Sequence, residues 1–263
     1  MNNFTLRILF GGLYVAIMML AVVFGNPWLV ILMSFLSFLG LNEIARLANK
    51  EGNQNKYFNP IIFGGIIVYL GLFGARDLGK IEFVVAFLIQ LVCVVILYYS
   101  FKKRGTVNYF AAVVYIWLPL AALALWYTQY PGNNVNTLLF FLICIWFYDS
   151  MAYSVGKLIG KTPIFPKVSP KKTIEGTLGG GILTIVMMFF LNKYWLQLEA
   201  NAILLAFVLV FFGTYGDFVE SYLKRKLGIK DSGNLIPGHG GILDRLDSIL
   251  LSAIPYLVII TLF

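Results

Sequence analysis

Charged residues are scarce in this chain, and histidine and cysteine are almost missing from it. Only 12% of the 263 residues are charged and 60% are hydrophobic, whereas roughly 25% of the residues in soluble domains are charged. One histidine and two cysteines do not make a tetrahedral zinc site. Cys93 and Cys144 both fall in apolar runs, so we expect small core residues and not a disulfide. This composition excludes a soluble globular domain.

Long apolar runs take up most of the sequence. A helix needs about 20 mostly apolar residues to cross a bilayer, and the runs do not alternate as the strands of a β-barrel would. We therefore expect an all-α, polytopic integral membrane protein with about nine transmembrane helices. The first run lacks a convincing cleavage site, so we interpret it as an uncleaved helix. The expected spans are approximately 6–24, 28–47, 61–75, 83–101, 110–127, 137–156, 178–191, 202–223 and 248–263.

The distribution of the basic residues explains the net charge of +8. With nine spans and a cytoplasmic N-terminus, only Arg76, Lys80 and Lys193 of the 20 basic residues lie outside. The positive-inside rule predicts such a bias, so no nucleic-acid partner is needed to account for the charge. No domain linker or repeat is visible, and we expect one membrane domain. Residues 1–136 would form the scaffold and the lipid access route, and residues 137–263 carry the polar motifs.

Two acidic residues fall in or beside these apolar runs. Asp149 lies inside or at the end of the sixth run, where a carboxylate at membrane depth costs about 2.5–3.5 kcal/mol. It is a functional candidate, or else an aspartate at headgroup level. Glu43, with Arg46 and Lys50, ends the second run. These three form either a wall of a cytoplasmic pocket or ordinary interfacial charge that snorkels to water.

A basic loop with three prolines precedes the seventh run. Lys171, Lys172 and Thr173 lie directly before an expected helix start, where backbone N–H groups are free. Ammonium groups, a hydroxyl and such donors would make a phosphate cradle. The segment is not a Walker motif, because the required order of residues is missing.

The end of the eighth run has a polar face. Asp217, Glu220, Ser221 and Lys224 follow at i, i+3, i+4 and i+7, so a helix places them on one side. We expect them to line one water-filled cavity, with Asp217 deepest, because a charge facing lipid would carry the full membrane cost. Four intervening residues should pack on lipid or on neighbouring helices: Phe218, Val219, Tyr222 and Leu223.

Carboxylates and basic groups alternate from this face to Asp247. Hard oxygen ligands suit Mg²⁺, which is usually held by one or two carboxylates together with water and substrate phosphates. Basic groups suit the phosphates themselves. This combination of carboxylates and basic residues fits phosphoryl or nucleotidyl transfer. A loop whose residues only neutralise one another in salt bridges would have the same composition. The residues are Asp217, Glu220, Asp231, Asp244 and Asp247, with Lys224, Arg225, Lys226, Lys230 and Arg245.

The segment from Ser221 to Asp247 resembles the phosphatidate cytidylyltransferases, also called CDP-diacylglycerol synthases. It has their pattern S-x-x-K-R-x-x-x-x-K-D-x-x-x-x-x-P-G-H-G-G-x-x-D-R-x-D in order and spacing. Two further blocks, SPKKTIEG from Ser169 and GDFVES from Gly216, are also similar to that family. The N-terminal half resembles it only in length and hydropathy.

The resemblance implies that CTP and phosphatidate condense to CDP-diacylglycerol and pyrophosphate at the cytoplasmic face of a bacterial inner membrane. It implies Mg²⁺ at Asp217 and Asp244, with Asp149 and Asp247 as further candidates, and a homodimer that could also use a monovalent cation such as K⁺. Catalytic candidates are Asp217, Ser221, Lys224, Asp244, Arg245 and Asp247. Phosphate-binding candidates are Lys171, Lys172, Thr173, Lys230 and His239.

Two rival functions remain open from the sequence. A CTP-dependent kinase of polyprenol or phytol would use a similar metal site but transfer the γ-phosphoryl group. An ion-coupled transporter would also bury Asp149 and Asp217, but it would not need a loop suited to metal and phosphate.

Overall fold

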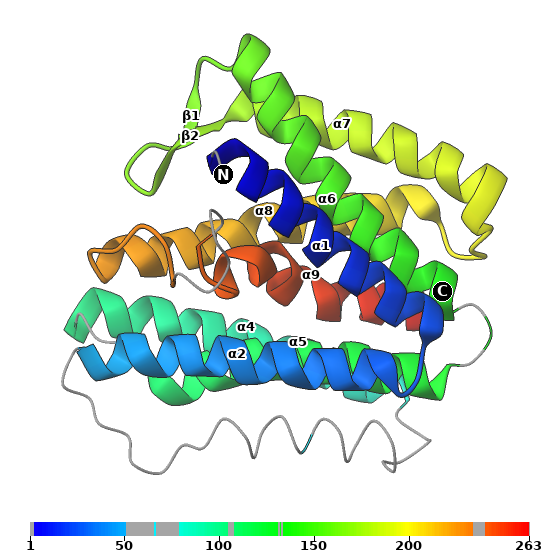
Figure 1. Ribbon diagram of the computed structural model, residues 1–263, viewed down its shortest axis with the longest axis horizontal. Coiled ribbons are helices and arrows are strands. Elements are labelled where there is room, and N and C mark those ends of the chain that lie inside the picture. The colour runs from blue at the N-terminus through cyan, green and yellow to red at the C-terminus, as the bar shows by residue number, and fades with distance from the viewer. Residues whose placement is uncertain are drawn as a thin grey trace.

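The computed structural model describes residues 3–50, 66, 79–104, 108–130, 132, 134–233 and 240–262. The chain forms a bundle of long helices, in which some helices lie side by side and others cross them obliquely (Figure 1). The expected span 61–75 lies outside the described residues, apart from residue 66. The helices are α1 (Asn3–Phe24), α2 (Trp28–Lys50), α4 (Lys80–Arg104), α5 (Tyr109–Gln129), α6 (Asn134–Ile159), α7 (Ile174–Leu191), α8 (Ala202–Lys226) and α9 (Leu243–Leu262).

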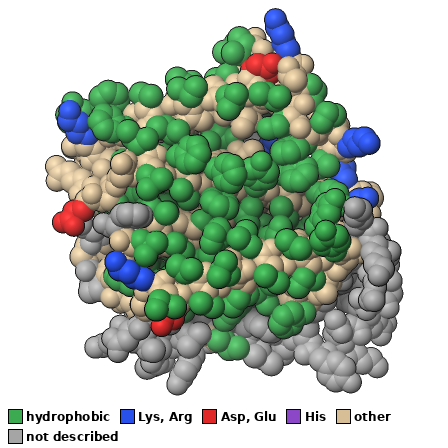
Figure 2. Space-filling view, turned by 180° about the vertical axis from the view of Figure 1, so that it is seen from behind, with side chains coloured by type: hydrophobic (Ala, Val, Ile, Leu, Met, Phe, Trp, Pro, Cys, Tyr) green, Lys and Arg blue, Asp and Glu red, His purple; other side chains and the backbone are tan. Residues whose placement is uncertain are grey.

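Seven of the described helices, α2 and α4 to α9, are long and apolar enough to cross a membrane. The apolar part of α1 is shorter and covers Leu9–Phe24. Hydrophobic side chains cover most of the face shown in Figure 2, and the charged ones lie toward its edges. Such a surface suits lipid and not water. The prediction of an all-α polytopic membrane protein is confirmed, while the count of nine spans and the orientation of the N-terminus stay predictions.

Helix α9 lies at the centre of the fold and contacts α4, α5, α6 and α8. Tyr256 of α9 is fully buried, and its hydroxyl donates to the Thr137 carbonyl of α6 at 2.8 Å. On another side, Gln90 of α4 donates to the Leu250 carbonyl at 2.6 Å. These bonds satisfy polar groups that have no access to water in the bundle. They fix α9, whose first two turns carry Asp244 and Asp247, relative to the other helices.

Glycines allow α6 and α7 to pack closely. A β-carbon at Gly180 would lie 2.5 Å from the backbone nitrogen of Ala152, and one at Gly176 would lie 2.7 Å from the Ala152 carbonyl oxygen. Small residues let helix backbones approach each other in membranes. The glycine cluster that follows Thr173 therefore serves helix packing, and the phosphate cradle expected from Lys171, Lys172 and Thr173 stays a prediction.

A β-hairpin connects α6 to α7 and was not predicted. Strand β1 (Pro163–Phe165) pairs antiparallel with β2 (Ser169–Thr173). The Glu175 carboxylate accepts the backbone N–H groups of Lys161 and Thr162, both at 3.1 Å. Arg225 of α8 donates to the Val168 carbonyl at the tip of the hairpin at 3.2 Å. The hairpin thus brings Lys171 and Lys172 toward the polar end of α8.

The arrangement of the two ends of the bundle supports a topological prediction. The N-terminus lies at the same end as the hairpin, and the C-terminus lies at the opposite end (Figure 1). We expect Lys103, Lys167 and Asp231 to be cytoplasmic, and Asn133 and the C-terminus to be outside, because the basic residues gather on the first side. Helix α6, with 26 residues, is about 39 Å long and separates Asn133 from Lys167.

Labelling of single cysteines with an impermeant maleimide in sealed vesicles would check this topology. The background needs Cys93 and Cys144 removed, although both are buried free thiols. Asn133→Cys and Lys167→Cys should react from opposite sides. Labelling of both from the same side would contradict the topology. Asn133 itself lies outside the described residues.

Candidate active site

The polar face of α8 forms as its spacing predicts. Ser221 Oγ donates to Asp217 Oδ1 at 3.1 Å, one turn earlier in the helix. Lys224 Nζ lies 2.5 Å from Glu220 Oε2, again one turn apart. Helix α8 continues unbroken through Gly216 to Lys226. All four side chains therefore lie on one side of one helix, as two bonded pairs.

Asp217 lines a cavity of about 600 Å³ between α6, β2 and α8. Asp149 of α6 lines the same cavity and is exposed. Lys171, Lys172 and Thr173 contribute to it from β2. Lys157 of α6, which the sequence argument did not single out, lines it as well. Two carboxylates and three ammonium groups thus share one space that is large enough for a small polar ligand.

The strongest contact in this cavity is the ion pair between Lys172 Nζ and Asp217 Oδ2. Burial by itself would lower the pKa of Lys172, but the neighbouring Asp217 carboxylate outweighs this effect, and the pKa lies above its usual value. The ammonium group therefore stays charged at neutral pH. In this structure Lys172 neutralises one of the two carboxylates of the cavity.

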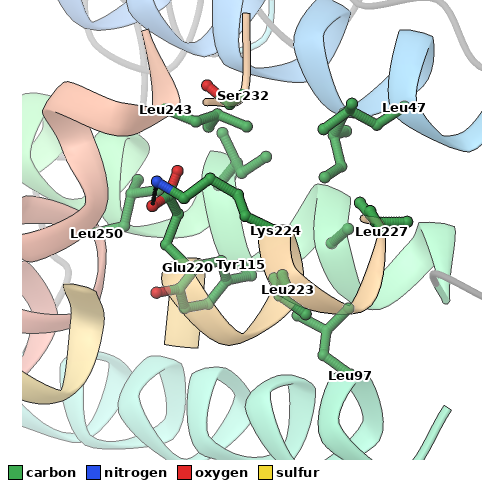
Figure 3. A pocket seen from close by; sticks show the side chains of 13 residues that line it. Leu47, Leu97, Tyr115, Glu220, Leu223, Lys224, Leu227, Ser232, Leu243 and Leu250 are labelled. Carbon is green, nitrogen blue, oxygen red and sulfur yellow. Dashed lines mark ion pairs between the residues drawn. The ribbon is translucent and has the colours of Figure 1, made fainter. Parts of the chain in front are cut away.

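Glu220 and Lys224 line a second, separate pocket. Their ion pair lies among apolar side chains from α2, α4, α5 and α9, including Leu47, Leu97 and Leu250 (Figure 3). This pocket has about 30 Å³ of free space, enough for a water molecule or two.

The prediction of one shared cavity with Asp217 deepest is therefore wrong. The Asp217 side chain is 22% exposed, whereas that of Glu220 is 9% exposed. The first and the last of the four residues are seven positions apart, or about 10 Å along the helix axis. The two ends of the polar face of α8 consequently have different neighbours. Asp217 lies beside α6 and β2, and Lys224 contacts α9.

The residues between these positions pack on neighbouring elements, as predicted. The ring of Phe218 lies 4.0 Å from that of Phe165 in β1, measured between centroids. Tyr222 lies 5.5 Å from Tyr98 of α4 on the same basis. Val219 packs against the core, and Leu223 is buried within it.

Asp244, in the first turn of α9, is enclosed by donors. Its Oδ1 accepts from Lys224 Nζ at 2.5 Å. Its Oδ2 accepts from the backbone N–H groups of Ser232 at 2.9 Å and Gly241 at 2.8 Å, and it lies 3.1 Å from Ser232 Oγ. One oxygen therefore organises the loop before α9, and the other faces an ammonium group.

The other candidates in α9, Asp247 and Arg245, are not among the residues that line the large cavity. Asp247 is half-buried and interacts electrostatically with Asp217 and Asp149. Helices α8 and α9 are close here, because a β-carbon at Gly216 would lie 2.5 Å from the Asp247 carbonyl oxygen. The side chain of Arg245 is exposed, while its carbonyl accepts from the Tyr14 hydroxyl of α1 at 3.3 Å.

The remaining candidates fall into three groups. Lys171 lines the large cavity. Thr173 also lines it, but its Oγ1 accepts from Gly176 N at 3.1 Å and so caps α7. Lys230 is exposed, and His239 lies outside the described residues.

The donor set of the large cavity fits Mg²⁺. Within the described ranges, no three His, Cys, Asp or Glu side chains could hold a metal ion among themselves. Mg²⁺ needs no such set, because it binds through one or two carboxylates and keeps waters or substrate phosphates as its other ligands. Asp149 and Asp217 offer two carboxylates beside the lysines that would receive those phosphates.

The sequence argument underestimated Glu43. This carboxylate of α2 is 6% exposed and accepts two backbone N–H groups at the start of α9. It is not an interfacial charge that snorkels to water, whereas its neighbour Arg46 is exposed. The signal that could have found it is the one used for Asp149, an acidic residue within an apolar run.

Together, the apolar helices define a polytopic membrane protein, and the charged side chains of the large cavity are of the kinds that bind metals and phosphates. Residues 5–263 match the sequence model of the Cytidylyltransferase family. The chain belongs to this family.

Named relatives support this assignment. A phosphatidate cytidylyltransferase of Aquifex aeolicus (strain VF5) is 30% identical over 244 residues, which are 93% of this chain and 86% of the relative. A protein of the same name from Bacillus subtilis (strain 168) is 48% identical over 111 residues, 41% of each chain. One from Staphylococcus haemolyticus (strain JCSC1435) is 44% identical over 126 residues, 45% of this chain and 46% of the relative.

Proposed function

We propose that this protein transfers the cytidylyl group of CTP to phosphatidate, giving CDP-diacylglycerol and pyrophosphate. The observation that carries the proposal is the 600 Å³ cavity in which Asp149 and Asp217 lie beside Lys171 and Lys172. Carboxylates for a metal next to cations for phosphates are what nucleotidyl transfer requires. The membership of the family, and the name that its relatives share, support the same reaction.

The chemistry needs positioning more than proton transfer. The second ionisation of a phosphate monoester lies near pH 6, so phosphatidate is largely a dianion at neutral pH. Its oxygen attacks the α-phosphorus of CTP, a new phosphorus–oxygen bond forms, and the bond to the bridging oxygen of the pyrophosphate breaks. No strong base is required. The protein must hold the two phosphates in line and stabilise the charge that the leaving group gains.

Asp217 is the first candidate to hold Mg²⁺, with Asp149 beside it in the cavity. Bound there, Mg²⁺ would neutralise charge on the triphosphate. Asp244 could contribute Oδ1, the oxygen that now holds Lys224, while Oδ2 keeps the loop in place. Asp247 is a further candidate because of its electrostatic interactions with Asp149 and Asp217.

The lysines supply the opposite charge. In this structure Lys172 and Lys224 each pair with a candidate metal ligand. A cation on Asp217 would free the Lys172 ammonium group for phosphate oxygens, whereas Lys224 would keep its ion pair with Glu220. Ser221, bonded to Asp217, would orient that carboxylate. The other proposed phosphate contacts are Lys171, Thr173, Lys230, His239 and Arg245.

The cellular setting is part of the proposal. The bias of basic residues toward the end with the cavity favours a cytoplasmic active site in a bacterial inner membrane. CTP would then enter from the cytoplasm, and phosphatidate from the lipid around α6 and α7. A homodimer and a monovalent cation such as K⁺ are expectations that come from the resemblance of the sequence.

An assay with two labels tests the reaction. Purified protein in detergent micelles receives phosphatidate, Mg²⁺ and CTP that is radiolabelled at either the α- or the γ-phosphorus. The proposal predicts that the α-label enters the lipid and that the γ-label leaves as pyrophosphate. A lipid kinase would put the γ-label into its lipid alcohol instead. With active, folded protein, failure of the α-label to reach phosphatidate would refute the proposal.

A further inference from the structure

The hairpin of β1 and β2 forms one wall of the large cavity. Four of the five residues of β2 line this cavity: Ser169, Lys171, Lys172 and Thr173. Lys172 also contacts α8 through its ion pair with Asp217. A metal ion on Asp217 would replace that ion pair, so the wall must be positioned by other contacts if Lys172 is to bind a phosphate.

The base of the hairpin is fixed to the beginning of α7. Glu175 Oε1 accepts the Thr162 hydroxyl at 2.9 Å, in addition to the two backbone N–H groups that Oε2 accepts. Ile174 N–H donates to the Thr162 carbonyl at 2.9 Å. Pro163 pairs with Thr173, the residue after Lys172. These bonds place the end of β2 without a candidate metal ligand.

The tip of the hairpin is fixed to α8 by two side chains. The ring of Phe165, at the end of β1, lies 4.0 Å from that of Phe218 between centroids. Arg225 Nε donates to the Val168 carbonyl at 3.2 Å. Val168 N–H in turn donates to the Phe165 carbonyl at 3.1 Å, so both side chains hold the same turn. We call the Phe165–Phe218 and Arg225–Val168 contacts the tip contacts.

The helical spacing of α8 separates the tip contacts from the charged cavity. Phe218 and Arg225 are seven positions apart, so they project from the same side of α8, about 10 Å apart along its axis. Asp217 precedes Phe218 directly but projects about 100° away from it and lines the cavity. One side of α8 therefore holds the hairpin, and the adjacent side receives Lys172 from it.

Arg225 has a different role from the one that its charge suggested. The sequence grouped it with the cations that suit phosphates, but it is not among the residues that line the large cavity. Its Nη1 donates to the Ile229 carbonyl at 3.0 Å while Nε donates to Val168. Because the guanidinium is planar and its donors point in fixed directions, the bond to Ile229 orients the bond to the hairpin.

We propose that Phe165 and Arg225 are positioning residues that hold the hairpin on α8 independently of the ion pair between Lys172 and Asp217. The Lys172 side chain can then leave Asp217 for a phosphate of CTP while its backbone stays in place. The part of the inference that concerns CTP rests on the proposed function. The part that concerns the hairpin rests on the contacts of its base and tip.

The variant Phe165→Ala tests both parts, because it removes the ring and leaves every charge of the cavity unchanged. Hydrogen exchange of peptides covering 163–173, measured in micelles without substrate, should become up to about tenfold faster, since a ring pair is worth up to about that factor in an equilibrium. A hairpin attached only a third of the time raises the apparent dissociation constant for CTP about threefold. Titration of CTP with Mg²⁺, without phosphatidate, should show this rise, and kcat should change less than the KM for CTP.

Two further variants decide which contact holds the hairpin. Phe165→Tyr keeps the ring at a half-buried position and should restore wild-type exchange and CTP affinity. Lys172→Met removes the ion pair and should leave exchange of 163–173 unchanged. Exchange as fast in Lys172→Met as in Phe165→Ala would show that the ion pair holds the hairpin and would overturn the inference. Peptides from α5 should exchange alike in all variants.

The remaining outcomes separate the parts of the inference. Unchanged exchange of the hairpin in Phe165→Ala would overturn the role of the ring contact. Faster exchange with unchanged affinity for CTP would overturn the positioning role. If the wild-type protein itself transfers no cytidylyl group, the proposed function fails, while the exchange results still decide whether the tip contacts hold the hairpin.

Arg225→Met gives a second test if Phe165→Ala does not fold. It removes the bonds to Val168 and Ile229 from an exposed side chain. Lys226→Met is the matched control for exchange, because it makes the same change of charge at the next exposed residue, whose ammonium group lies over the Tyr222 ring of α8 itself. Exchange of 163–173 should accelerate in Arg225→Met only. Equal exchange in the two variants would remove Arg225 from the positioning residues.

Discussion

Asp217→Asn is expected to lower CTP turnover by on the order of 10²-fold or more in a protein that still folds. Asp217 provides the carboxylate that the large cavity takes from α8, and Asn has nearly the same volume but no charge. Lys172 would lose its ion-pair partner, and a divalent cation would lose a ligand. The check is the rate of α-label transfer to phosphatidate over a range of Mg²⁺ concentrations. Isothermal titration of Mg²⁺ into the protein without substrate should show weakened binding.

Val219→Leu is the matched control for this change. Val219 lies two positions further along α8 and packs against the core, away from the polar face. The Val219→Leu variant should keep most of the CTP turnover, because a larger apolar side chain at this position changes packing and not charge. Wild-type turnover of Asp217→Asn at ordinary Mg²⁺ would place the metal elsewhere, even though the membership of the family would stand.

Hydropathy predicted the helices well but not their polar ends. Helix α9 begins at Leu243 and α7 at Ile174, several residues before the apolar runs at 248 and 178. The polar first turn of each helix carries no hydrophobic signal. What starts α7 is Thr173, whose hydroxyl caps Gly176 N–H, and such a cap can be read from a sequence only when the helix start is already suspected.

The candidate site was predictable where spacing along one helix determines it. The i, i+3, i+4 and i+7 positions of α8 place four polar residues on one side in any helix. Spacing does not say which neighbours the two ends of that side will meet. Asp217 meets Lys172 of the unpredicted hairpin, and Lys224 meets Asp244 of α9. These contacts arise from the packing of helices that are distant in sequence.

A local pattern can also have two readings that only packing separates. Thr173 and the glycines after it fit a phosphate cradle and equally fit a capped helix that packs tightly. In the structure, the hydroxyl caps α7, and Gly176 and Gly180 contact α6. Glu43 is the converse case. Its sequence context allowed two interpretations, and the buried bonds to Ile242 and Leu243 show that it contacts the beginning of α9 and not the solvent.

Asp244→Asn is expected to abolish turnover to a similar degree, by on the order of 10²-fold or more, and by a different route. Asp244 uses both oxygens as acceptors, Oδ1 for the Lys224 ammonium group and Oδ2 for Ser232 and Gly241. Asparagine keeps only one acceptor, and either placement of its NH₂ group sets donor against donor. Because the loop contacts are broken together with the charge, raised Mg²⁺ should not restore activity. Hydrogen exchange of the Ser232 and Gly241 amides, which donate to Asp244 in the wild-type protein, should accelerate.

Asp231→Asn is the matched comparison, since it makes the same change of charge at an exposed position in the same loop. It should reduce turnover far less, because the Asp231 side chain is open to solvent while that of Asp244 is 6% exposed. Near-normal turnover of Asp244→Asn at ordinary Mg²⁺ would remove this residue from the proposed metal site.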